Sequence, residues 1–438
     1  MLTAIAAMGL ASGIPYLLVN DAITAWLADV KVDITSIGLL ALCTLPYGLK
    51  FLWAPLLDAV RAPITGRLGR RRGWLVLAMV ACVALTMLIA WRTPPTREAV
   101  LALAEQGALR PILLSVAIAT LALAFCSATL DVVVDAYRAD SVDAQSLGRG
   151  ASLYVAGWRA AVILAGSAVL ILPDRLGWPL SYGLMGLVLL VPLVATLWAT
   201  EPTRGGAPGS LKPGSLKPRS FKQDVLLPIT NLIERFRWRT IALIIFVLVY
   251  RLPDLFPGRM VMPFLMNEVH FTKDEIGLLR QFGGAVVTIA GALLGGSLIA
   301  RWGVARCLLL FGILQAASNA GYLLLWWSGH SIPAFIAAIA IENFCNGLVA
   351  SVFVAYLMSL CDARVSATQY ALFTGLMFGA ASIAASPSGY VVESLGWGGF
   401  FAVSVALGLP GILMIPLVAR LPSTTAASTA TTASADTP

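Results

Sequence analysis

The sequence has few of the residues on which acid–base and metal chemistry depend. Only 2 histidines occur among 438 residues, and the 6 cysteines show no paired metal-ligand spacing. A membrane-embedded enzyme such as an acyltransferase would need these groups clustered at one depth, but His270 and His330 are separated from the acids of the apolar runs. We therefore expect no enzyme activity, no metal, no cofactor and no disulfide.

Charge is also scarce, and long hydrophobic runs take its place. Charged residues make up 12% of the chain and hydrophobic residues 59%, which excludes a soluble multidomain protein. A helix needs about 20 apolar residues to cross the hydrocarbon core of a membrane, and runs of that length recur along the chain. The sequence predicts an all-α, multi-pass membrane protein with twelve transmembrane helices.

The placement of the basic residues predicts the orientation of the chain. If the N-terminus is cytoplasmic, most of the 30 Lys and Arg fall in cytoplasmic segments, as the positive-inside rule requires, and both termini are cytoplasmic. A Gly-, Pro-, Ser- and Lys-rich stretch at 200–238 predicts a linker, and residues 421–438 predict a disordered tail. We expect six-helix halves at 1–199 and 239–420, lipid contacts, no nucleic acid partner and a monomer.

The second half of the chain repeats the first in the same sense. The segment SIGLL at 36–40 returns as EIGLL at 275–279, and FCSATLDVVVDAY at 125–137 returns as FCNGLVASVFVAY at 344–356. Two six-helix halves of the same sense form a parallel repeat, which is the plan of the major facilitator superfamily.

One polar stripe interrupts the apolar run that ends in FCSATLDVVVDAYR. Residues three and four apart share a helix face, so Ser127, Asp131, Asp135 and Arg138 lie together. Ionised groups at membrane depth are costly and mark ion or substrate paths. The alternative is a structural ion pair, for example of Asp135 with Arg159.

Buried acids are candidates for proton coupling, because burial favours the protonated form of a carboxylate and a nearby cation favours the ionised form. The first span contains Pro15 and then the polar pair Asn20 and Asp21, and span seven has Pro253 at the corresponding place. We therefore expect the first span to be a broken helix that faces a cavity. The proton-coupling candidates are Asp131, Asp135, Glu342, Asp21 and Asp254.

An arginine beside aromatic residues is a natural binding pair for a sugar or peptide that carries a carboxylate. Span five opens with such a group, ASLYVAGWR. Simpler readings remain open: an interfacial aromatic for Trp158, and interhelical hydrogen bonds for Gln315 and Asn319. The substrate-binding candidates are Arg159, Tyr154, Trp158, Tyr16, Asn20, Arg251, Arg280, Gln315, Asn319 and Asn346.

Six long segments together resemble the AmpG-type muropeptide permeases of the major facilitator superfamily. They are MGLASGIPYLLVNDAITAWL, LPYGLKFLWAPLLD, LGRRRGWL, FCSATLDVVVDAYRAD, FGILQAASNAGYLLL and ATQYALFTGL. The resemblance implies proton-driven import of anhydromuropeptides, anionic sugar-peptides of the GlcNAc-anhydro-MurNAc type, across the bacterial inner membrane for cell-wall recycling.

The resemblance also implies a conformational switch and leaves the cargo open. Asp58 with Arg70, Arg71 and Arg72 resembles the superfamily's cytoplasmic signature between spans two and three. Leu130 stands where muropeptide permeases have a polar amide, several of them continue for two further spans, and the extended family includes siderophore and acetyl-CoA transporters. Export is disfavoured because span five lacks the proline of the drug–proton antiporters, and a purely sensory role would predict binding without transport.

Overall fold

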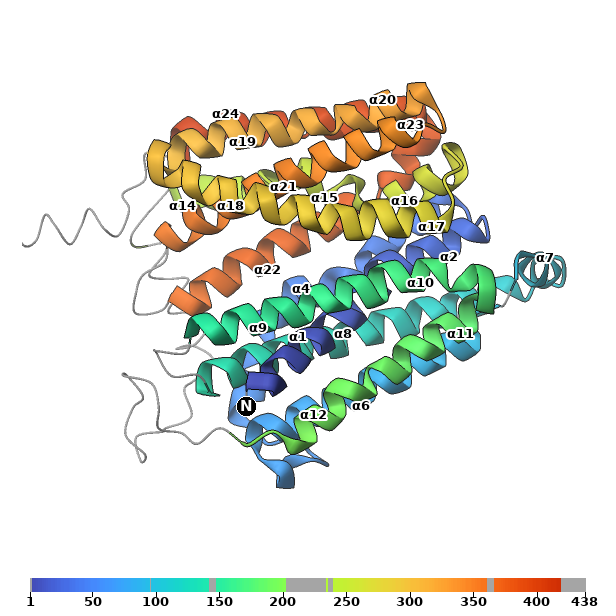
Figure 1. Cartoon of the computed structure of the whole chain (residues 1–438), viewed down its shortest axis with the longest axis vertical. Helices are drawn as coiled ribbons and strands as arrows, with labels where there is room; N and C mark the ends of the chain where they lie inside the picture. The colour runs from blue at the N-terminus through green and yellow to red at the C-terminus, as the bar shows by residue number, and fades with distance from the viewer. Residues whose placement is uncertain are drawn as a thin grey trace, which may run out of the picture. The chain divides into compact units, whose positions relative to one another are not determined.

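The computed structural model describes residues 2–94, 96–141, 147–201, 234, 239–360 and 366–418. Every regular element in these ranges is a helix (Figure 1). Ten helical stretches are long and apolar enough to cross a membrane, and two shorter apolar helices, Ala156–Ile171 and Leu372–Ala385, stand where spans five and eleven are predicted. The predicted all-α architecture of twelve spans is confirmed.

The chain divides into two compact units. Unit one comprises Met1–Pro218 and Arg259–Phe282, and unit two comprises Arg219–Gly258 and Gly283–Pro438. Residues 259–282, which the sequence assigns to the second half, therefore pack with the N-terminal helices. Almost all of the predicted linker at 200–238, and the whole of the predicted tail, lie outside the described residues.

Unit one is built around the first span. Helix α1 packs against α9 and α8, and α6 packs against α8 and α11 (Figure 1). The helices of its first part are α1 (Leu2–Leu17), η1 (Leu18–Ala22), α2 (Ile23–Asp29), α3 (Ile34–Leu39), η2 (Leu40–Thr44), α4 (Leu45–Leu49), η3 (Lys50–Leu52), α5 (Ala54–Ala59), η4 (Gly66–Leu68), α6 (Arg70–Arg92), α7 (Arg97–Glu105), α8 (Leu109–Ser141), α9 (Leu147–Ala161), η5 (Val162–Ala168), α10 (Val169–Ile171), α11 (Pro173–Val188) and α12 (Leu190–Trp198). Its later part holds α16 (Val261–Pro263), η8 (Phe264–Glu268), α17 (Lys273–Glu275) and η9 (Ile276–Gly283).

Short π-helical segments interrupt the spans of unit one. Segments η1, η5, η8 and η9 are all π-helices, and η1 follows directly on Pro15 of α1. A π turn breaks the regular hydrogen-bond ladder of a helix and is frequent at functional sites. The broken first span that the sequence predicts is confirmed.

Unit two packs its helices around a cluster of aromatic rings. Helix α18 runs alongside α21 (Figure 1), and Tyr250 stacks on Phe353 with ring centroids 5.4 Å apart. Its helices are α14 (Arg239–Val249), α15 (Leu252–Leu255), α18 (Gly284–Trp302), α19 (Val304–Ser318), α20 (Ala320–Ser328), α21 (Ile332–Leu360), α22 (Ser366–Ala385), α23 (Ser388–Ala406) and α24 (Gly408–Val418), and η7 (Pro257–Arg259) lies at the boundary of the two units.

Backbone geometry repeats together with the sequence. Among the described non-glycine residues only Lys31 and His270 have positive φ, 57° and 65°, and they occupy matched places before SIGLL and EIGLL. Asp33 and Thr272, two residues later in each copy, cap the helix that follows. The strained turn and its cap are therefore features of the duplicated unit.

A second pair of turns repeats in the same way. The tripeptide LGW at 176–178 returns at 395–397, with the same offset as the two FC segments. The glycines of the two copies, Gly177 and Gly396, have φ of 77° and 67° and separate consecutive helical segments. Only glycine adopts this left-handed conformation at little cost, so the repeat extends to the joints between spans.

Glycine lets α18 and α21 approach each other closely in unit two. A Cβ atom on Gly291 would lie 2.2 Å from the carbonyl oxygen of Phe344, and one on Gly347 would lie 2.2 Å from that of Thr288. Such small-residue contacts bring helix backbones together in membranes. The close packing that the Gly291 and Gly295 spacing predicts is confirmed.

Replacement of Gly291 by Ala should therefore force α18 away from α21. We expect a loss of about 1–3 kcal/mol in the free energy of unfolding, measured as a fall in the thermal unfolding midpoint of the purified protein. Gly296 of the same helix is the control, since a Cβ there has no atom within 4 Å. Equal midpoints for Gly291→Ala and Gly296→Ala would contradict this packing.

Candidate functional site

Asp131 forms the centre of a polar cluster in unit one. The Lys50 Nζ lies 3.9 Å from its Oδ2, and the Asp131 side chain is only 19% exposed. Ser12 and Tyr154 lie beside the carboxylate, whereas its Oδ1 is buried and has no hydrogen-bond partner among the described residues. The carboxylate is thus held by one cation on one oxygen and leaves the other oxygen open.

Asp135 occupies a different environment from Asp131. Its side chain is 59% exposed and pairs with Arg138 Nη1 at 3.2 Å, and the Arg138 guanidinium lies 4.1 Å above the Tyr154 ring. The suggested pair of Asp135 with Arg159 is wrong. Asp135 pairs with Arg138 instead, because Arg138 lies one turn further along the same helix. The polar stripe therefore runs from a buried acid to an exposed ion pair.

The aromatic and basic candidates of spans one and five lie on neighbouring helices α1 and α9. The Arg159 guanidinium is 5.6 Å from the Trp158 ring. The residue is half-buried, and its buried Nε has no hydrogen-bond partner in the described chain. Tyr16 meets Tyr47 edge to face at 5.2 Å, and Asn20 Nδ2 donates to the Tyr16 carbonyl at 2.9 Å. Asn20 therefore serves the broken helix itself.

Asp21 lies on η1 and receives a hydrogen bond from a residue far away in sequence. Gln281 Nε2 donates to its Oδ2 at 3.1 Å. Arg259, also close to Asp21, donates through Nη1 to the carbonyls of Val19 and Asn20, both at 2.9 Å. This candidate acid is thus part of the contact between span one and residues 259–282.

A second cluster brings four of the predicted residues together in unit two. Arg251 and Asp254 form an ion pair whose side chains are 14% and 5% exposed. Asn346 Nδ2 donates to Asp254 Oδ1, and Asn319 Nδ2 donates to the Pro253 carbonyl at 2.6 Å. Asp254 thus receives donors from α21 and from its own helical turn, so its charge is well compensated.

The other candidates of the second half differ in their surroundings, and Gln315 lacks the interhelical hydrogen bonds that were its simpler reading. Gln315 is 3% exposed, and neither atom of its amide has a partner within the described residues. Asn343 Nδ2 donates to the half-buried Glu342 at 2.8 Å. Arg280 is half-buried on η9 and belongs to unit one, whereas Arg251 belongs to unit two.

The predicted switch residues contact the segment that follows span six. The backbone amides of Arg71 and Arg72 donate to the two oxygens of Glu201 at 2.8 and 2.9 Å, and the Arg72 guanidinium donates to the carbonyls of Thr196 and Leu197. A carboxylate at a helix N-terminus satisfies unpaired amides and the helix dipole. Arg70 begins α6, and the Asp58 side chain lies outside the described residues.

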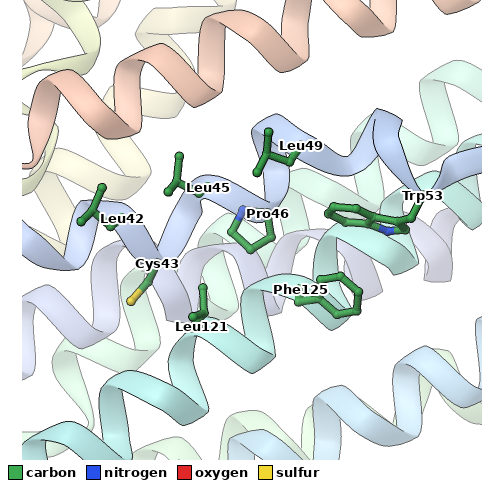
Figure 2. Close-up of a pocket in the computed structure, with 8 residues that line it drawn as sticks. All are labelled: Leu42, Cys43, Leu45, Pro46, Leu49, Trp53, Leu121 and Phe125. Carbon is green, nitrogen blue, oxygen red and sulfur yellow. The ribbon is translucent and has the colours of Figure 1, made fainter. Parts of the chain in front are cut away.

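An apolar pocket lies close to the Lys50 and Asp131 pair. It has a volume of about 380 Å³ (Figure 2). Trp53 and Phe125 form its aromatic end with ring centroids 4.8 Å apart, and Trp53 Nε1 donates to Thr129 Oγ1 at 3.1 Å. The lining residues are Leu42, Cys43, Leu45, Pro46, Leu49, Trp53, Leu121 and Phe125. The pocket thus offers an aromatic and aliphatic surface next to Lys50 in the chain, since Leu49 is one of its lining residues.

Comparison with known proteins agrees with this architecture. Residues 2–175 match the family model described as acetyl-coenzyme A transporter 1, and residues 259–437 match that of the major facilitator superfamily. The chain is 36% identical over 415 residues to the anhydromuropeptide permease of Escherichia coli K12, covering 94% of this chain and 78% of the relative. An AmpG-type transporter of Rickettsia bellii is 27% identical, covering 93% and 95%.

The chain belongs to the anhydromuropeptide permease family. Solved structures support the superfamily fold: a D-xylose–proton symporter has a TM-score of 0.68 at 13% identity, covering 96% of this chain and 97% of the symporter. A peptide transporter, POT, has a TM-score of 0.69 at 13% identity, covering 96% and 95%. The permease is therefore a multi-pass membrane transporter with a small-molecule substrate.

Three polar contacts of the permease involve residues that are absent from the sequence-based candidates. Lys50 pairs with Asp131. Glu201 caps α6, and Lys273 contacts two acids of unit one. For Lys50 and Glu201 the signal was a charge inside or at the end of an apolar run, and for Lys273 it was a charged loop before one; the sequence does not show which residue each of them contacts.

The ion pair in unit two yields a stability prediction for the permease. Asp254→Asn leaves the Arg251 guanidinium without its opposite charge in a buried site, so we expect a loss of about 3–5 kcal/mol, measured by chemical unfolding in mixed micelles. The double variant Arg251→Met with Asp254→Leu should recover most of this loss. Asp135→Asn, in an exposed pair, is the control and should cost about 0–1 kcal/mol; an equal loss in both single variants would refute the assignment.

Proposed function

We propose that the permease is a proton-coupled secondary transporter that imports anhydromuropeptides, GlcNAc-anhydro-MurNAc-peptides, across the bacterial inner membrane for cell-wall recycling. The name of the E. coli relative, 36% identical over most of the chain, supports the cargo. The observation that carries the transport mechanism is Asp131, a partly buried acid with a single cation at 3.9 Å. Transport without a catalytic step is part of the proposal.

The cargo combines sugar rings with peptide carboxylates, and unit one offers a partner for each. Arg159 is half-buried and has an unused Nε, so its guanidinium suits a carboxylate. The faces of Trp158 and Tyr154 suit sugar rings. Arg251 is a weaker candidate, because Asp254 already neutralises it.

Asp131 is the best-placed of the proton-coupling candidates. Its Oδ1 has no hydrogen-bond partner while Oδ2 faces Lys50, so a proton can be added to Oδ1 without displacing the ammonium group. Protonation would neutralise the pair's negative member and release Lys50 from its attraction. Asp254 and Asp21 already receive hydrogen bonds on one oxygen from amide side chains.

The proposed orientation places both termini in the cytoplasm, with six-helix halves at 1–199 and 239–420. The arginines of LGRRRG, which Glu201 holds at the start of α6, would then lie on the cytoplasmic side. Protons, membrane lipids and a monomeric state complete the proposal.

One observation supports acetyl-coenzyme A as a second candidate cargo. Residues 2–175 match the acetyl-coenzyme A transporter model, and those residues include the Asp131 cluster and Arg159. A coenzyme A thioester, like a muropeptide, is a large anionic solute. It is the competitor substrate in the assay that follows.

The function is tested by uptake of labelled anhydromuropeptide into proteoliposomes, with and without an inward proton gradient. We expect gradient-dependent accumulation that a protonophore abolishes. Asp131→Asn should lose it, because the amide cannot carry the proton, whereas Asp135→Asn should keep most of it, because Asp135 is exposed and locally paired. Accumulation by Asp131→Asn would remove this acid from the mechanism, and acetyl-coenzyme A uptake alone would replace the cargo.

A further inference from the structure

Four polar side chains of residues 259–282 bind span one in unit one. We call this segment the hairpin. Its donors are Arg259, Asn267, Lys273 and Gln281, and each of them donates to an acceptor between Val19 and Asp29. In these contacts the hairpin supplies the donors, and span one supplies the acceptors, which are backbone carbonyls, a hydroxyl and carboxylates. These four residues therefore all donate from the hairpin to span one.

Arg259 anchors the hairpin on the broken part of span one. Besides the carbonyls of Val19 and Asn20, its Nη1 bonds to Thr24 Oγ1 at 3.0 Å, and its side chain is buried. A π-helical turn such as η1 frees backbone carbonyls from the helix ladder. The break in span one thus supplies acceptors for a cation that arrives from another span.

Lys273 forms the ionic end of the contact. Its Nζ lies 2.9 Å from Asp29 Oδ2 and also contacts Asp174, and the Lys273 side chain is 11% exposed. Trp178 Nε1 donates to the same Asp29 oxygen at 2.7 Å. One ammonium group therefore joins span one, the hairpin and the turn between spans five and six.

This ionic group lies at the end of unit one opposite to the arginine cluster. Asp174 stands at the start of the stretch Pro173–Trp198, and Glu201, which holds Arg71 and Arg72, follows its end. The continuous part of this stretch runs from Trp178, directly after the break at Gly177, to Trp198, and about 21 helical residues span about 32 Å at a rise of 1.5 Å per residue. The two charged groups are therefore on opposite membrane faces, and the Lys273 group lies on the external face in the proposed orientation.

The duplicated fold does not require this lysine. In the alignment of SIGLL with EIGLL, Lys273 corresponds to Ile34, although both copies share the strained residue and the capped turn. The first copy builds the same turn with an apolar residue at this place. The two acids have acidic counterparts in the other copy, Glu268 for Asp29 and Glu393 for Asp174, so the lysine alone is the addition that turns these acids into an ionic group.

We propose that the hairpin and span one form an external latch, in which Lys273 with Asp29 and Asp174 is the ionic bolt, and that this latch opens and closes once in each transport cycle. In the open state water replaces each donor's acceptor, so the four contacts can be exchanged without leaving buried polar groups unsatisfied. The proposal adds to the transport function and rests on it for the uptake measurement only.

Cross-linking tests whether the latch must open. Asp29→Cys and Lys273→Cys are combined in a background without the native cysteines, and a reversible bifunctional methanethiosulfonate reagent joins them. We expect gradient-driven uptake of anhydromuropeptide to fall at least about tenfold and to return on reduction, as for a closed gate. Each single-cysteine variant, treated in the same way, is the control. Full uptake by the cross-linked permease would overturn the proposal.

Hydrogen exchange tests the latch without any substrate. In lipid nanodiscs, Lys273→Gln should speed amide exchange in peptides covering 18–29 and 259–282 by about tenfold, because the bolt no longer favours the closed state. Arg301→Gln, at an exposed arginine on α18, is the control and should leave both peptides unchanged. Unchanged exchange in Lys273→Gln would overturn the latch.

The two measurements separate this proposal from the proposed function. Failure of the unmodified permease to take up anhydromuropeptide would count against the cargo, and the exchange measurement would then decide the latch. Faster exchange together with loss of uptake on cross-linking supports both.

Discussion

Charge buried among apolar helices constrains the whole permease. An ionised side chain in such surroundings is stable only with an opposite charge or several dipoles within reach. The described residues meet this need in different ways: a single ammonium faces Asp131, Arg251 and Asp254 compensate each other, and Arg259 binds backbone carbonyls. The contacts of Asp131 and Arg259 tie together spans that are distant in sequence, whereas Arg251 and Asp254 lie three residues apart.

The breaks in the helices make these solutions possible. In a regular helix the inner carbonyls already accept intrahelical hydrogen bonds, so a break makes backbone acceptors more available to a foreign cation. Span one provides them at η1, immediately after Pro15. The hairpin that binds there contains two further π-helical segments, η8 and η9. Irregular backbone is thus concentrated where one span must hold another through polar contacts, which are exchangeable with water in a way that close apolar packing is not.

Much of the fold could be predicted from the sequence, because its signals are local or repeated. Apolar runs gave the spans, Pro15 the broken helix, and the Gly291 and Gly295 spacing the close approach of α18 and α21. Partners of charges were harder to predict. Asp135 pairs with Arg138 one turn away, which the helical spacing already indicated, whereas Lys50 and Asp131 are far apart in sequence. Only the three-dimensional packing of spans two and four brings them together.

Comparison of the two copies separates what the scaffold needs from what transport needs. The positive-φ turn, its cap and the LGW joint occur in both copies, so they serve folding. Some charges do not repeat: Ala350 matches Asp131, and Ile34 matches Lys273. The fold does not need the charges of Asp131 and Lys273, and burying them costs desolvation free energy, which points to a role in transport. Their pairs are only partly buried: the side chains of Lys50 and Asp131 are 26% and 19% exposed, so water can take the place of a partner when the pair separates. A transporter that must visit two states of similar free energy needs such contacts, because uniformly strong burial would trap one of them.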